Sequence, residues 1–155
     1  PYKHLISTSF AFISHGSDIW KLPEMDFVFN TAFISQYGDN MIDLVKSYYE
    51  LSSPYQKPFM FAEYGGHARG NDASELAGNF YTGIWAQYMN PYIAGCTGFW
   101  WWSFIESQDL YNRYKGLADY NLGEERFMTS FTPISVTTSN NQLGGLGKMT
   151  RDRHY

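Results

Sequence analysis

Cysteine is almost absent from this sequence, since Cys96 is the only one among 155 residues. An intramolecular disulfide is therefore excluded, and Cys96, which lies in an apolar stretch, is interpreted as a small core residue. His4 and His15 have no partners at a spacing that favours metal ligation. We therefore expect neither a metal site nor a bound cofactor.

Long apolar runs and clustered charges are also missing. No apolar run approaches the ~18 residues that a membrane span requires. The 11 basic and 15 acidic residues are scattered, with no basic stripe of the kind that binds nucleic acid. We expect no membrane and no nucleic-acid partner, while a secreted, periplasmic or cytoplasmic location all remain open.

Aromatic residues, in contrast, are abundant: 13 Tyr, 12 Phe and 5 Trp make up 19% of the chain. Aromatic rings present flat apolar faces, and Tyr and Trp add a polar group to them. Sugars present flat C–H faces beside hydroxyl groups, so an aromatic cleft suits carbohydrate. Most of these residues must nevertheless build the core, and composition alone is a weak indication of carbohydrate binding.

Four apolar runs predict β-strands, at residues 4–12, 26–33, 58–64 and 96–102. They are nearly continuous rather than alternating, which is typical of parallel strands that are buried on both faces. Helices are predicted between them: a turn or two near 17–22, a helix over 40–52 capped by Asp39, a helix over 73–89 capped by Asp72, and a helix near 110–121. The order is β-α-β-α-β-α-β-α, and the spacing suits βαβ crossover units.

Four such units predict an α/β fold that is the (βα)4 half of a TIM barrel. The half-barrel would occupy residues 1–126, and residues 127–155 would form a short extension, either β or loose coil. The rival fold is a doubly wound, flavodoxin-like sheet, which usually carries a Gly-rich phosphate loop after its first strand. No such loop follows residues 4–12.

A half-barrel would leave two sheet edges and an apolar inner face without partners. Open edges pair readily with other strands. We therefore expect either a homodimer, in which two copies supply eight strands, or docking onto a missing N-terminal half-barrel.

The ends of the predicted strands carry the candidate site, because catalytic groups of (β/α)8 barrels lie at the C-terminal ends of the strands. The third strand ends at Glu63, and the fourth ends at Trp100, Trp101 and Trp102. Glu106 follows shortly afterwards, and it is expected to be a solvated loop residue rather than a second catalytic carboxylate.

Strand alternation predicts which side chains share a face. If Glu63 points into the barrel, Phe59 and Phe61 point inward too, and Met60 and Ala62 face the helices. Without a substrate role, Glu63 would be a structural carboxylate, paired with Arg69 or bound to a backbone N–H.

The motifs "KPFMFAEYGG" (residues 57–66) and "GFWWWSF" (98–104) together resemble the last two strands of the retaining (β/α)8 glycoside hydrolases, the cellulase-like and β-galactosidase-like superfamily. "KHLISTSF" and "PEMDFVFNTAF" are similar to the two strands before them. The resemblance implies that Glu63 is the nucleophile and that the tryptophans line a sugar subsite. The substrate-binding candidates that follow from it are Trp100, Trp102, Tyr64, Phe33 and His67.

The sequence departs from that family at two points. The tyrosine that would hydrogen-bond the nucleophile is matched by Phe33, unless Tyr37 or Tyr64 replaces it. The acid/base glutamate belongs to a strand that this chain lacks, whereas retaining hydrolysis needs two carboxyls about 5–5.5 Å apart. Two hypotheses follow: hydrolysis of O-glycosidic bonds with Glu63 as nucleophile and the acid/base absent, or a non-catalytic carbohydrate-binding or structural fragment with little or no turnover.

Overall fold

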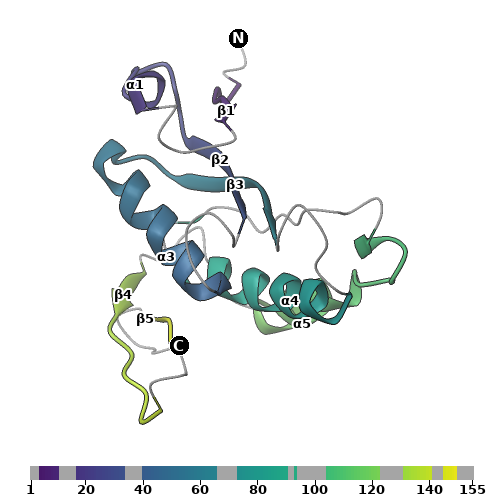
Figure 1. Ribbon diagram of the computed structural model, residues 1–155. Helices are drawn as coiled ribbons and strands as arrows, with labels where there is room; N and C mark the ends of the chain where they lie inside the picture. Colours follow the sequence, from purple (N-terminus) through teal and green to yellow (C-terminus); the bar gives the residue numbers. More distant parts are fainter. Residues whose placement is uncertain are drawn as a thin grey trace.

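The computed structural model describes residues 4–10, 17–33, 40–65, 73–90, 93, 104–122, 131–140 and 145–149. Within them the chain is a mixed α/β fold with a parallel three-stranded sheet and a small antiparallel sheet (Figure 1). The elements in chain order are β1 (Ser9–Phe10), α1 (Ser17–Trp20), β2 (Val28–Phe33), α3 (Met41–Ser52), the 3-10 turn η2 (Ser53–Tyr55), β3 (Phe59–Gly65), α4 (Ala73–Met89), α5 (Asn112–Tyr120), β4 (Thr132–Ile134) and β5 (Gly147–Met149).

The parallel sheet has the strand order β1-β2-β3, so each strand lies beside the one before it in the sequence. The predicted strands at 26–33 and 58–64 are confirmed. Of the first, predicted over 4–12, the structure describes residues 4–10, and within these Ser9–Phe10 form a strand. Phe59 pairs with Val28 of β2 on one side and forms a parallel bridge to Ile93 on the other. The predicted fourth strand, 96–102, lies outside the described residues.

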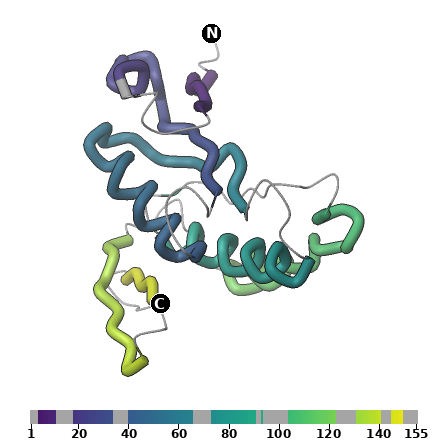
Figure 2. Tube along the Cα trace, viewed as in Figure 1, coloured from purple at the N-terminus to yellow at the C-terminus, as the bar shows by residue number. Residues whose placement is uncertain are grey.

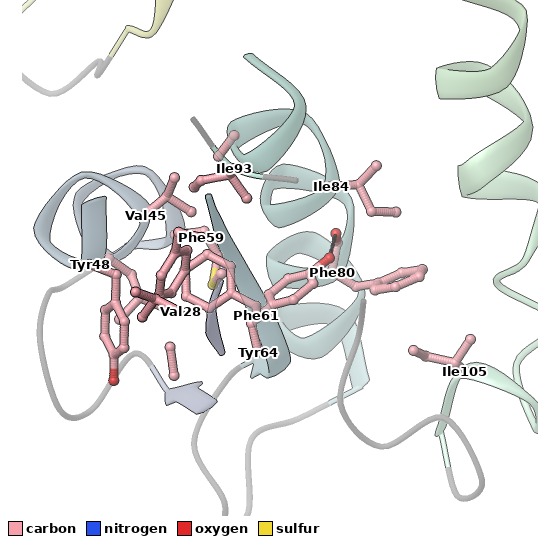
Figure 3. Close-up of a cluster of buried hydrophobic side chains, with 14 of the residues drawn as sticks. Val28, Val45, Tyr48, Phe59, Phe61, Tyr64, Phe80, Ile84, Ile93 and Ile105 are labelled. Atoms are coloured by element: carbon pink, nitrogen blue, oxygen red, sulfur yellow. Dashed lines mark hydrogen bonds between the residues drawn. The ribbon is translucent and has the colours of Figure 1, made fainter. Parts of the chain in front are cut away.

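Helices α3 and α4 lie together on one face of this sheet (Figure 1). The core between the helices and the sheet is aromatic: the ring of Phe61 lies 4.7 Å from Phe59 and 5.5 Å from Tyr48 of α3, centroid to centroid (Figure 3). Phe59 and Phe61 are 1% and 0% exposed. The prediction that they line the face away from the helices is therefore wrong, because both pack against α3.

Helix α3 begins one residue later than the sequence suggested. Its N-cap is Asn40 rather than Asp39, and the Asn40 Oδ1 accepts hydrogen bonds from the N–H groups of Ile42 and Asp43, both at 3.0 Å. Asn and Asp are about equally good caps, so a choice between neighbours depends on local backbone geometry. The face of α3 that meets the core is formed by Met41, Leu44, Val45 and Tyr48.

The remaining helices match their predicted positions. The turn predicted near 17–22 is α1, the helix over 73–89 is α4, and the helix near 110–121 is α5. The chain segment after α5 contains the β4–β5 hairpin, which lies beside the helices and away from the parallel sheet (Figure 2). None of the helices in the described segments is long and apolar enough to cross a membrane.

Candidate functional site

A β-bulge in β3 decides where Glu63 points. Asn30 of β2 pairs with Phe61, and the next residue, Thr31, pairs with Glu63, so Ala62 is an extra residue in β3. Side chains alternate along a regular strand, and one extra residue moves every later side chain to the opposite face. Because of the bulge, Glu63 does not follow Phe61 into the core, where an unpaired carboxylate would be costly.

Glu63 therefore lies on the face of the sheet that α3 and α4 do not cover. It is half-buried at the C-terminal end of β3, beside its pairing partner Thr31. Phe29, Phe33 and Met60 share this face and are also half-buried. Two of the predicted site residues, Glu63 and Phe33, are thus brought to the same end of the same face.

Tyr64, a predicted substrate-binding residue, lies on the helix side of β3 and not on the face of Glu63. It is 1% exposed and points toward α4, where its hydroxyl donates a hydrogen bond to the Phe80 carbonyl oxygen at 3.0 Å. The backbone of Gly83 lies so close to the ring that a Cβ added there would be 2.0 Å from Tyr64 Cε2. Tyr64 and Glu63 point to opposite faces, so the Tyr64 hydroxyl does not lie beside the Glu63 carboxylate.

Asn30 is a buried polar residue beside the pairing partner of Glu63, and the sequence did not single it out. It is fully buried on the helix side of β2, directly at the register shift. Its Oδ1 accepts a hydrogen bond from the Thr31 N–H at 2.9 Å, while its Nδ2 is buried and has no hydrogen-bond partner within the described segments. An asparagine inside an apolar strand was the available signal, because such a residue needs a local hydrogen bond to be tolerated.

Glu106 is exposed, as expected of a solvated residue. It accepts a hydrogen bond from the Tyr111 hydroxyl, and this bond raises the pKa of the Tyr111 phenol above its ordinary value. The bond stabilises the neutral phenol, which alone can donate to the carboxylate. The carboxylate of Glu106 thus forms a local hydrogen bond with a residue five positions later in the same segment.

Trp100, Trp102 and His67 lie outside the described residues, as do Tyr37 and Arg69. Within the described segments, no group of three or more His, Cys, Asp or Glu side chains is arranged to hold a metal ion.

Comparisons of the chain with protein-family models, with curated proteins and with solved structures find no match.

Proposed function

We propose that this chain is half of a (β/α)8 barrel of the glycoside hydrolase type, and that Glu63 is the nucleophile of a retaining reaction on O-glycosidic bonds. One observation carries the proposal: a half-buried carboxylate stands at the C-terminal end of a parallel strand, on the face that the helices leave uncovered. Catalytic groups of (β/α)8 barrels occupy this position.

The strand order supports a barrel over a doubly wound sheet. In a doubly wound sheet the strand order reverses and helices cover both faces. Here β1, β2 and β3 follow one another in a single direction, and α3 and α4 lie on the same face. The parallel bridge from Phe59 to Ile93 continues that direction, a few residues before the strand predicted at 96–102.

The residues around Glu63 suit a sugar ring. Phe33 and Phe29 provide apolar surface on the same face as Glu63. We propose that Trp100 and Trp102 of the predicted fourth strand extend this surface. In the first step a Glu63 carboxylate oxygen bonds to the anomeric carbon as the bond to the leaving-group oxygen breaks. A leaving group that is stable as an anion needs no proton, so this step can proceed without the acid/base carboxylate.

The barrel requires four further strands for closure. We propose that they come from a second copy of this chain or from an N-terminal half-barrel, which would also supply the acid/base carboxylate. Light scattering coupled to size exclusion tests the first alternative. A dimer of the 17.9-kDa chain is expected, and a stable monomer at micromolar concentration would exclude self-association.

Hydrolysis of activated aryl glycosides, measured with a broad panel of sugars, tests the role of Glu63. Glu63→Gln is nearly isosteric, and it should lower the rate by about 10³-fold or more because it removes the nucleophile. Glu106→Gln is the matched control, since it changes an exposed glutamate that is bonded to Tyr111, and it should retain the parental rate. Parental activity in Glu63→Gln would refute the assignment.

A further inference from the structure

The C-terminal hairpin holds a buried lysine. Lys148 lies in the middle of β5, and its side chain is 0% exposed. Burial of an ammonium group is costly unless the site replaces the interactions that it makes with water. The surroundings of Lys148 therefore need to attract a cation.

Two aromatic rings and a helix end surround this ammonium. The Lys148 Nζ lies 3.7 Å from the centroid of the Tyr88 ring and 4.3 Å from that of Phe131. It also donates a hydrogen bond to the Tyr88 carbonyl oxygen at 3.1 Å. Ring faces attract cations, and the last turn of a helix, where Tyr88 lies, carries partial negative charge.

These contacts join separate parts of the chain. Tyr88 belongs to α4, Phe131 directly precedes β4, and Lys148 belongs to β5. Each strand of the hairpin has only three residues. A two-stranded hairpin is at best marginally stable in water, so it depends on its attachment to the helices.

The hairpin also borders a groove. Leu146, which directly precedes β5, lines an apolar groove of about 360 Å³ together with side chains of α3 and α4. These side chains are Ile42, Tyr81, Thr82, Trp85, Ala86 and Met89. Any movement of the hairpin away from α4 would remove Leu146 from the groove and expose its apolar surface.

We propose that the Lys148 ammonium, held between the Tyr88 and Phe131 rings and the Tyr88 carbonyl, is a latch that fastens the hairpin to the end of α4 and keeps Leu146 in the wall of the groove. The latch depends on the charge of Lys148. An apolar side chain of similar length fills the same space but loses the attraction to the rings and to the helix end.

Hydrogen exchange of the full chain, followed by mass spectrometry, tests the latch with Lys148→Met. Exchange in peptides from 131–140 and 145–149 should become about tenfold faster or more, because a desolvated cation–π pair is lost. Exchange in β2 and β3 should be unchanged. Binding of an apolar fluorescent dye should increase as the groove opens.

Tyr88→Phe is the control, since it keeps the ring and the carbonyl and loses only a hydroxyl that is bonded to Asn121 Oδ1. Hairpin exchange in this variant should stay within about twofold of the parent. If Lys148→Met does not fold, Phe131→Leu removes one ring and should release the hairpin alone. Parental hairpin exchange or parental dye binding in a folded Lys148→Met, or acceleration spread equally over β2 and β3, would overturn the proposal.

Discussion

The two faces of β3 differ in chemistry although they belong to the same seven residues. On the helix side, the side chains of Phe59, Phe61 and Tyr64 are buried and pack against α3 and α4. On the other side, Met60 and Glu63 are half-buried, and Glu63 stands at the strand end. The helix side stabilises the fold, and the opposite side presents the one carboxylate of the strand.

A single extra residue separates these roles. Without the bulge at Ala62, alternation would place Glu63 on the face of Phe61, among aromatic rings. With it, Glu63 points to the uncovered face, and Tyr64, the next residue, points to the helix side as regular alternation requires. Substitutions on the two faces should therefore affect different properties: stability on the helix side and glycoside chemistry on the other.

The largest effect is expected for Phe61→Ala. Phe61 is fully buried among Phe59, Tyr48 and Tyr64, so the substitution should lower the free energy of unfolding by about 3–5 kcal/mol. Met60→Ala, one residue earlier on the half-buried face, should cost less than half as much. Chemical denaturation measures both, and equal losses would mean that the two faces of β3 are equally packed.

Gly83→Ala should give the next largest loss. The added Cβ would be 2.0 Å from the Tyr64 ring, and overpacking of this kind costs about 1–3 kcal/mol of unfolding free energy. Gly78→Ala is the matched control in the same helix, with no atom within 4 Å of the added Cβ. It should stabilise the chain by up to about 1 kcal/mol, since alanine favours helix. Equal losses of unfolding free energy in the two variants would show that the close contact between Gly83 and the Tyr64 ring is not the cause.

Tyr64→Phe tests whether a substitution on the helix side, next to Glu63 in sequence, affects stability without affecting the glycoside rate. Loss of the hydrogen bond to the Phe80 carbonyl should cost about 1–2 kcal/mol of unfolding free energy. The rate on activated glycosides should not change, because the hydroxyl points away from Glu63. A large fall in rate without loss of stability would restore Tyr64 as a site residue.

The smallest effect on stability is expected for Asn30→Ala. It removes the acceptor of the Thr31 N–H but also the unpartnered Nδ2, so the two changes partly offset one another and the net loss should stay near or below about 1 kcal/mol. The glycoside rate should nevertheless fall, because Thr31 pairs with Glu63. Asn40→Ala is the control: it removes a helix cap, costs about 1 kcal/mol, and should leave the rate unchanged.

The sequence predicts regular elements well and irregular geometry poorly. Apolar runs locate β2 and β3, and the segments predicted as helices coincide with α3, α4 and α5. The bulge at Ala62 leaves no pattern, since Ala, Glu and Tyr all continue a strand, and alternation alone therefore misplaced Phe59 and Phe61 relative to Glu63. The cap at Asn40 was missed because Asp39 beside it is an equally good capping residue.

The surroundings of Glu63 are likewise only partly predictable from sequence patterns. Its position at a strand end follows from the apolar run before it and the glycines after it. The surroundings of Asn30 depend on the register between two strands that are distant in sequence, with Asn30 pairing with Phe61 and Thr31 with Glu63. Contacts of this kind are set by tertiary packing, so sequence patterns alone cannot supply them.

Covalent labelling tests most directly whether the carboxylate on the uncovered face is a nucleophile. A panel of 2-deoxy-2-fluoro glycosides with dinitrophenolate leaving groups needs no general acid for the first step, and the fluorine at C2 should slow release of the sugar because it destabilises the oxocarbenium-like transition state. We expect the intact mass to increase by one fluorosugar, carried by the peptide that contains Glu63, and no increase in Glu63→Gln. Absence of an adduct across the panel, or an adduct of equal yield in Glu63→Gln, would contradict the assignment of Glu63 as the nucleophile.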